Sequence, residues 1–111
     1  MIPPSFDYHC PKTVSEAVAL LTKFGDEAKI LAGGHSLLPM MKLRFAEPAN
    51  LTDINKIPEL RGIKEEGGVI KIGAMTTENQ VLFSEVLKQK VPLLPEAAKL
   101  IADPQVRNRG T

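Results

Sequence analysis

The sequence predicts one small domain of mixed α/β (α+β) class with a small mixed sheet and flanking helices. Helical and strand-like patterns follow one another in the order helix, strand, helix, strand, strand, strand, helix, helix. A short apolar run, Ile30–Ala32, is followed by paired glycines and a hydroxyl residue, which is typical of a strand that turns into a helix. The chain has 111 residues, 43% of them hydrophobic and 24% charged, as in ordinary globular domains.

The first half of the chain alternates strands and helices. Residues 6–10 alternate weakly and predict a short edge strand. Thr13-Val14-Ser15-Glu16 is a capping box, apolar residues then recur at helical spacing, and Gly25 ends the pattern, so we predict a helix over 13–24. The other elements predicted in this half are a strand over 28–32, a short helix over 37–43 and a strand over 51–54.

The second half begins with a β-hairpin, because two short apolar runs flank Glu66-Gly67-Gly68 within residues 62–72. A second capping box at Thr77–Gln80 opens a helix that is expected to reach about Lys88. Pro92 opens another helix, which Asp103-Pro104 ends, and no regular structure is predicted for residues 105–111. The residues predicted on or near the buried face of this helix are Leu94, Ala97, Ala98, Leu100 and Ile101.

Charge and composition exclude several classes of protein. The net charge is +1, from 14 basic and 13 acidic residues, which gives no electrostatic reason to expect nucleic-acid binding. The single Cys10 excludes an internal disulfide framework and suits a reducing compartment. No apolar run has the length of a membrane span, and Met1–Phe6 lacks the features of a signal peptide, so we expect a cytoplasmic protein.

The segment Lys29–Pro39 is the most informative part of the chain. Gly33 and Gly34 allow a sharp turn after the strand, and Ser36 can cap a helix that begins at Leu37. Such a turn directs several backbone N–H groups at one point and predicts a cradle for a phosphate or a pyrophosphate. A simple tight turn is the alternative interpretation. The spacing matches neither the dinucleotide fingerprint nor the P-loop, and Lys42 lies too far along to act as a P-loop lysine.

Other polar residues have two interpretations each. His35 either donates to a ligand or tolerates an unusual backbone angle in the turn, and Ser36 can combine a cap with a phosphate donor. Asp53 is expected to order a turn, while Met40 and Met41 are expected in the core. The acidic residues before the glycine pair of the hairpin are expected to be solvated.

The remaining reactive residues form no recognisable catalytic set. His9 and Cys10 have no further partners at metal-binding spacing, and Cys10 has no positioned base. Arg107 and Arg109 either meet phosphate or an acidic partner, or lie in solvent. Any catalysis therefore depends on a bound cofactor.

Several segments resemble one family. Lys29–Arg44 resembles the first flavin motif of the FAD-binding (medium) subunits of molybdenum hydroxylases, of the carbon monoxide dehydrogenase and xanthine dehydrogenase type. Further segments resemble that family in the same order along the chain: Pro4–Tyr8, Leu51–Leu60, Ile72–Thr77 and Ile101–Thr111. The resemblance implies the N-terminal lobe of a vanillyl-alcohol-oxidase-type (PCMH-type) FAD-binding domain.

The resemblance also implies a cofactor site for FAD. Backbone N–H groups of the first motif hold the FAD pyrophosphate in that family, and Thr111 matches the first residue of a second flavin motif. The residues implied in the site are Leu31, Ala32, Gly33, Gly34, His35, Ser36, Leu37, Ile101, Gly110 and Thr111.

The implied function is electron transfer within an oxidoreductase. In the family, electrons pass from a molybdenum-cofactor large subunit through a 2Fe–2S small subunit to FAD, which an external acceptor reoxidises. Residues 1–111 match only the N-terminal subdomain, without the second flavin lobe and the C-terminal domain. The alternative is a non-catalytic α/β lobe that does not hold FAD without a partner or its missing half. A separate chain that supplies the second lobe is a third interpretation.

Overall fold

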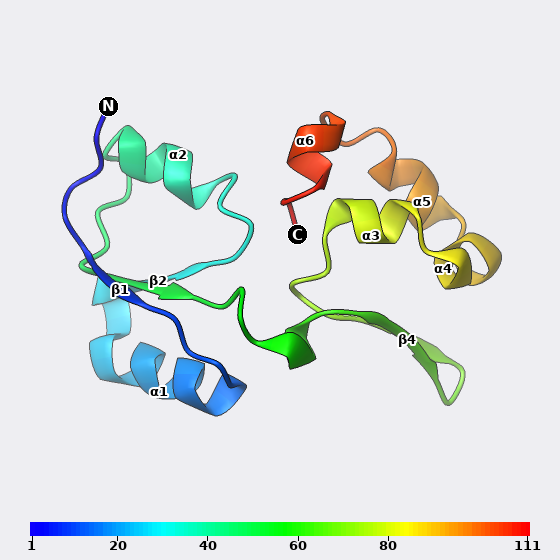
Figure 1. Cartoon of the computed structure of the whole chain (residues 1–111), viewed down its shortest axis with the longest axis horizontal. Helices are drawn as coiled ribbons and strands as arrows, with labels where there is room; N and C mark the ends of the chain where they lie inside the picture. Colours follow the sequence, from blue (N-terminus) through cyan, green and yellow to red (C-terminus); the bar gives the residue numbers. More distant parts are fainter. The chain divides into compact units, whose positions relative to one another are not determined.

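The computed structural model describes residues 1–111 and divides them into two compact units, residues 1–58 and 59–111 (Figure 1). The first unit contains a three-stranded parallel sheet, and the second contains a two-stranded antiparallel hairpin with four short helices. The mixed α/β class is therefore confirmed. No helix is long and apolar enough to span a bilayer.

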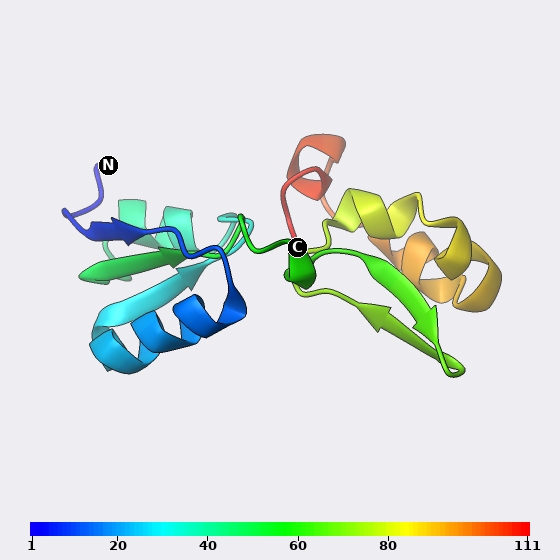
Figure 2. The same cartoon turned by 60° about the horizontal axis from the view of Figure 1, so that its bottom comes forward.

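The first unit is a small α/β sandwich. Its elements are β1 (Asp7–His9), α1 (Val14–Phe24), a short 3₁₀ helix (Gly25–Glu27), β2 (Ala28–Leu31), α2 (Leu37–Lys42) and β3 (Asn50–Asp53). The strands lie in the order β1-β3-β2, so the chain passes from one edge to the other and then returns to the centre. Because crossovers between parallel strands are right-handed, this reversal places α1 and α2 on opposite faces of the sheet, as Figure 2 shows.

The core of the first unit forms around its central strand. Leu51 and Thr52 of β3 are fully buried, as expected of a strand covered on both faces. Met41 of α2 is 1% exposed, which confirms its predicted place in the core, whereas Met40 is 43% exposed and that prediction was wrong. Consecutive helical residues point about 100° apart, so only one of the two methionines can face the sheet.

Capping residues set the ends of α1. The Thr13 hydroxyl accepts a hydrogen bond from the Glu16 N–H at 3.1 Å, as predicted. The Glu16 carboxylate accepts from the Lys12 N–H at 3.0 Å rather than from Thr13, so the return bond of the predicted capping box is shifted by one residue. Gly25, with φ +54°, ends the helix and donates its N–H to the Leu21 carbonyl.

The second unit begins within a 3₁₀ turn (Pro58–Leu60). The predicted hairpin is confirmed as β4 (Ile63–Glu66) and β5 (Val69–Ile72), joined by Gly67 and Gly68. The helices are α3 (Glu78–Leu82), α4 (Glu85–Lys90), α5 (Leu93–Ala98) and α6 (Pro104–Arg107).

Hydroxyl and carboxylate caps divide the second unit into more helices than the sequence predicted. The Thr77–Gln80 capping box is present, with both bonds made. The single helix predicted to reach Lys88 is broken, because Ser84 caps α4 by accepting from the Leu87 N–H at 3.3 Å. Asp103 likewise caps α6 by accepting from the Val106 N–H at 3.0 Å, so the prediction of an irregular tail was also wrong.

The buried face of α5 differs from the prediction. Ala98 is 2% exposed and Pro95 is buried, but Leu100 is 84% exposed and Ile101 is 41% exposed. Leu94 and Ala97 are also exposed. The predicted helix was too long: α5 ends at Ala98, so the helical spacing no longer applies to residues 100 and 101.

Candidate functional site

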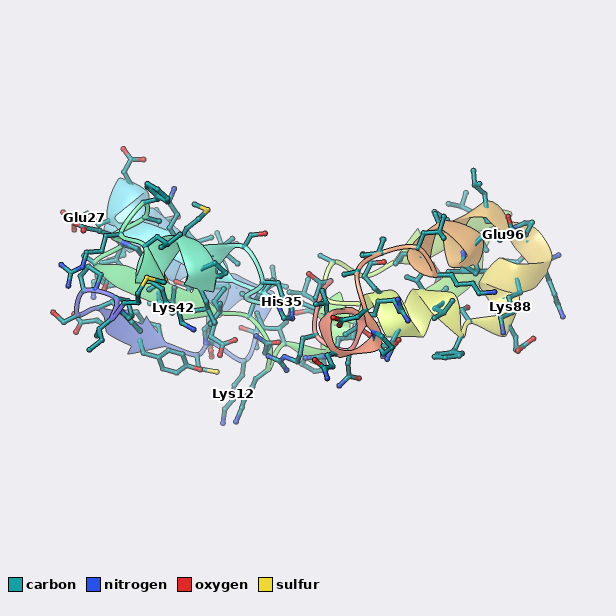
Figure 3. The ribbon with its side chains drawn as sticks, turned by 90° about the horizontal axis from the view of Figure 1, so that it is seen from above. Lys12, Glu27, His35, Lys42, Lys88 and Glu96 are labelled. Carbon is teal, nitrogen blue, oxygen red and sulfur yellow. The ribbon has the colours of Figure 1, made fainter.

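The loop between β2 and α2, residues 32–36, lies at the carboxyl edge of the parallel sheet. In Figure 3, His35 of this loop lies at the opposite end of the first unit from Glu27, which precedes β2. The chain reverses its direction across the sheet here, because β1 leads to β2 at the far edge and β2 leads back to the central β3. Open α/β sheets bind ligands outside the carboxyl ends of their strands, at such a reversal.

The loop presents backbone N–H groups that the chain does not use. The N–H groups of Gly33, Gly34, His35 and Ser36 donate to no acceptor in the chain, and the next bond along is from the Leu38 N–H to the Gly34 carbonyl at 3.1 Å. Neither Gly33 nor Gly34 is fully buried. Consecutive N–H groups without an acceptor in the chain are a feature of backbone anion sites.

Glycine is favoured at position 34 by the backbone conformation and by the neighbouring side chains. Its φ is +86°, a conformation that residues with a side chain rarely adopt. A Cβ at this position would lie 3.0 Å from Leu38 Cδ1 and 3.6 Å from Leu31 Cδ1. The two leucines therefore pack against the glycine, and a Cβ would require the Leu38 side chain to shift.

The polar side chains of the loop are unpaired within the chain. Ser36 precedes α2 directly, but its hydroxyl makes no capping hydrogen bond, so the prediction of a side-chain cap was wrong. Its φ and ψ, −110° and −50°, are helical rather than the extended values of a capping residue. His35 is exposed, and no charged residue lies within 32–36. The hydroxyl, the imidazole and the N–H groups of the loop are therefore available as donors to a ligand.

A hydrogen-bonded turn after β3 supports the loop. Asp53 Oδ1 accepts from the Asn55 N–H at 2.9 Å and from Asn55 Nδ2 at 2.7 Å, which confirms that Asp53 orders a turn. Asn55 Nδ2 also donates to the Ala32 carbonyl at 2.8 Å. The Tyr8 hydroxyl donates to Asp53 Oδ2, and this bond, followed by a contact with Cys10, raises the pKa of Tyr8 above its ordinary value of 10.0.

Asn55 was missed by the sequence interpretation. The signal that could have found it is Asp-Ile-Asn directly after a strand, because an aspartate that accepts from the residue two positions on forms an Asx turn. That the asparagine then reaches the neighbouring strand end depends on the parallel pairing of Leu31 with Asp53.

Two of the other predicted residues lie together in the second unit. Ile101 and Thr111 line a cavity of about 340 Å³, together with residues of β5, α3 and α5. Gly110 is tied on both sides: its N–H donates to the Val106 carbonyl at 2.7 Å, and its carbonyl accepts from the Glu78 N–H at 2.8 Å. These bonds hold Thr111 at the start of α3.

Arg107 has a structural role. Its Nη1 donates to the carbonyls of Ile101 at 3.0 Å and Ala102 at 3.3 Å, and lies 3.5 Å from that of Lys99. It is therefore not a side chain of a loose basic tail, and it fixes the backbone beside Ile101. Arg109 is exposed.

His9 and Cys10 do not form a reactive group with the residues of the 32–36 loop. The His9 ring stacks on Phe24 with centroids 5.1 Å apart, and its Nε2 lies 3.0 Å from Asn50 Oδ1. Cys10 is a half-buried free thiol. No group of three or more His, Cys, Asp or Glu side chains could hold a metal ion.

Comparison with known proteins gives the family of the chain. A family described as "FAD binding domain in molybdopterin dehydrogenase" matches residues 4–111. The chain belongs to this family. Among its relatives, the carbon monoxide dehydrogenase medium chain of Hydrogenophaga pseudoflava is 69% identical over all 111 residues. The xanthine dehydrogenase FAD-binding subunit of Escherichia coli O157:H7 is 36% identical over 105 residues, which are 94% of this chain and 36% of that protein.

Solved structures of family members have the same fold. The carbon monoxide dehydrogenase of Hydrogenophaga pseudoflava matches the whole chain with a TM-score of 0.98 at 69% identity. Quinoline 2-oxidoreductase of Pseudomonas putida 86 matches it with a TM-score of 0.95 at 35% identity. The chain spans 39% of the length of each of these two structures and of the Hydrogenophaga medium chain. These relatives are oxidoreductases or their subunits.

Proposed function

We propose that this chain is part of the FAD-binding electron-transfer component of a molybdenum hydroxylase and holds the FAD pyrophosphate in the 32–36 loop. The observation that carries the proposal is the run of consecutive N–H groups without an acceptor, Gly33 to Ser36 among them, at the carboxyl edge of the sheet. Membership of a family described by FAD binding supports the choice of FAD over other diphosphates.

The loop residues have separate roles in this proposal. The N–H groups of Gly33 to Ser36 donate to phosphate oxygens, and charge-assisted bonds of this kind are stronger than bonds between neutral groups. The Ser36 hydroxyl and the His35 imidazole add donors at the exposed side. Ala32 begins the turn, and Leu31 and Leu37 flank it as apolar neighbours of the cofactor.

The second unit contributes to the flavin end of the cofactor. Ile101 and Thr111 line one cavity, and Gly110 directly precedes Thr111. We assign these three residues to the lining of the flavin. FAD itself supplies the redox chemistry when bound, and this chain binds and orients it.

The assembly is inferred from the relatives. Their printed names include a carbon monoxide dehydrogenase medium chain, a nicotine 6-hydroxylase medium subunit and a xanthine dehydrogenase FAD-binding subunit. We infer that this chain works beside a molybdenum-cofactor large subunit and a 2Fe–2S small subunit, in the cytoplasm. Electrons then arrive at the FAD from the iron–sulfur partner.

One alternative is favoured by a specific observation. The chain spans only 39% of the length of the Hydrogenophaga medium chain. In the alternative, this lobe does not hold FAD without further sequence that contributes the second flavin motif and the C-terminal domain.

A titration of the chain with FAD, followed by flavin fluorescence and absorbance, tests the proposal. Saturable binding that ADP displaces is expected, because ADP shares the pyrophosphate, whereas riboflavin lacks it and is expected to bind far more weakly. Absence of saturable binding would contradict the proposal for this chain and support the alternative.

A further inference from the structure

The carboxyl ends of β2 and β3 are joined beyond the last paired residues. Leu31 and Asp53 are partners in the parallel register, and the Ile54 N–H donates to the Leu31 carbonyl at 3.1 Å. The next carbonyl, that of Ala32, accepts from Asn55 Nδ2 at 2.8 Å. Two successive carbonyls at the end of β2 are therefore bound by two successive residues that follow β3.

The second of these bonds does not belong to the sheet. Successive carbonyls of a strand point to opposite sides, so a continued β2 would direct the Ala32 carbonyl away from β3. Here a side chain from beyond β3 binds that carbonyl instead. The backbone therefore turns at Ala32, and the Asn55 amide binds the peptide group at which it turns.

This bond sets the direction of a donor in the loop. The carbonyl of Ala32 and the N–H of Gly33 belong to one peptide group, which is planar and trans, so they point in opposite directions. When Asn55 holds the carbonyl, the Gly33 N–H points away from the β3 end. The Gly33 N–H is one of the consecutive loop N–H groups that have no acceptor in the chain.

Asn55 is itself held in place. Its backbone N–H and its Nδ2 both donate to Asp53 Oδ1, at 2.9 and 2.7 Å. Asp53 Oδ2 accepts from the Tyr8 hydroxyl of β1. The hydrogen bonds thus connect all three strands to the loop, in the sequence Tyr8, Asp53, Asn55, Ala32.

The chemistry requires an amide at position 55. Both of its neighbours, a carboxylate oxygen and a carbonyl oxygen, only accept hydrogen bonds, and the Nδ2 group has two hydrogens, one for each. An aspartate of the same shape has no donor and places a second carboxylate beside Asp53. An alanine leaves the Ala32 carbonyl without its partner.

We propose that Asn55 is the positioning residue of the cradle, which holds the Ala32–Gly33 peptide so that the following N–H groups face a bound pyrophosphate, with Asp53 and Tyr8 orienting Asn55. The inference rests on the proposed function, because it concerns the same loop. Asn55 acts through the backbone of the loop.

The test compares three variants of the chain. Asn55→Ala removes both donors, and Asn55→Asp keeps the shape without the donors. Thr13→Ala is the matched control, because it removes one hydrogen bond in the same unit, from the Glu16 N–H, at the N-terminus of α1, and Thr13 makes no bond to the 32–36 loop. Each variant is examined for FAD affinity by flavin fluorescence, for thermal stability, and for amide hydrogen exchange of Gly33 to Ser36 by NMR.

Asn55→Ala and Asn55→Asp are expected to weaken FAD binding about tenfold or more and to speed hydrogen exchange in the loop. Thr13→Ala is expected to lower thermal stability and leave both loop readouts unchanged. FAD binding and loop exchange that are unchanged in both Asn55 variants would overturn the positioning role while the proposed function stands. Equal losses in Thr13→Ala would overturn it too, since general destabilisation would then suffice. If the wild-type chain does not bind FAD, the proposed function fails and the positioning role fails with it.

Discussion

The chain contains two glycine pairs that look alike in the sequence and differ in the structure. Gly33 and Gly34 lie between a strand and a helix, whereas Gly67 and Gly68 join two antiparallel strands. Gly67 and Gly68 have φ of +56° and +77°, the positive values that a two-residue type I′ hairpin requires, and a Cβ at either would meet nothing within 4 Å. A Cβ at Gly34 would meet Leu38 and Leu31.

The charge around the two pairs also differs. Glu65 and Glu66 directly precede the hairpin glycines and are exposed, as predicted, and Glu66 pairs with Lys71 at 3.0 Å. No charged residue lies within 32–36. Paired glycines alone therefore do not predict an anion site. Under the proposed function, the two pairs are distinguished by the neighbouring elements, the packing below the glycines and the local charge.

The largest expected effect is the loss of FAD affinity in Gly34→Val, and the same substitution at Gly67 is its control. Gly34→Val introduces a β-branched residue at φ +86° and 3.0 Å from Leu38, and we expect FAD affinity to fall at least about a hundredfold, or about 2.7 kcal/mol. Gly67→Val is expected to leave FAD affinity unchanged. Flavin fluorescence titration measures both, with Gly34→Ala as a milder variant that retains more stability. Unchanged FAD affinity in both Gly34 variants would contradict the assignment of the loop.

The hairpin pair is expected to affect stability alone. Gly67→Ala places a Cβ in open space, so its only cost is the left-handed backbone, about 1 kcal/mol in the free energy of unfolding. Chemical denaturation measures this change. A loss of FAD affinity in Gly67→Ala would remove the distinction between the two pairs.

A smaller effect concerns the hydrogen bonds through Tyr8, Asp53 and Asn55 that support the loop of the first glycine pair. The hairpin pair has no such support. Tyr8 is the only tyrosine and the chain has no tryptophan, so tyrosinate absorbance reports on Tyr8 alone. Its hydrogen bond to Asp53 raises its pKa above the ordinary 10.0, so ionisation is expected only at higher pH. Since the pKa is raised in the folded state, the stabilisation from this bond is present below about pH 10 and is lost as the pH rises through the folded-state pKa.

The control for this titration is Asp53→Asn, which removes the carboxylate and is expected to return the pKa of Tyr8 towards its ordinary value. An ordinary pKa in the wild-type chain would show that Tyr8 does not donate to Asp53 in solution.

The smallest expected effect is that of His35→Ala. The backbone N–H of residue 35 remains in this variant, so we expect FAD affinity to fall by less than about threefold. Complete loss of FAD binding would show that the imidazole side chain, rather than the backbone, is the main contact at this position.

Local patterns predicted the elements well where a cap or turn lies within a few residues. The Thr77–Gln80 capping box, the Gly25 helix end and the hairpin were all found in this way. Ser84 was overlooked as a cap because one helix was predicted to continue to about Lys88, and Asp103 because it was interpreted only as the end of the preceding helix. The loop at 32–36 was predicted as a strand-to-helix turn, but its support was not. The bond from Asn55 to Ala32 spans 23 positions and depends on the strand register, which local sequence does not reveal.

The measurement that tests the central claim most directly is a pair of NMR titrations of the 111-residue chain, one with FAD and one with riboflavin. Both glycine pairs are then observed in the same spectrum. The account predicts that FAD shifts the backbone amide signals of Gly33, Gly34, His35 and Ser36 and leaves those of Gly67 and Gly68 in place, and that riboflavin does not reproduce the shifts. FAD binding without shifts at Gly33 to Ser36, or equal shifts from riboflavin, would contradict it.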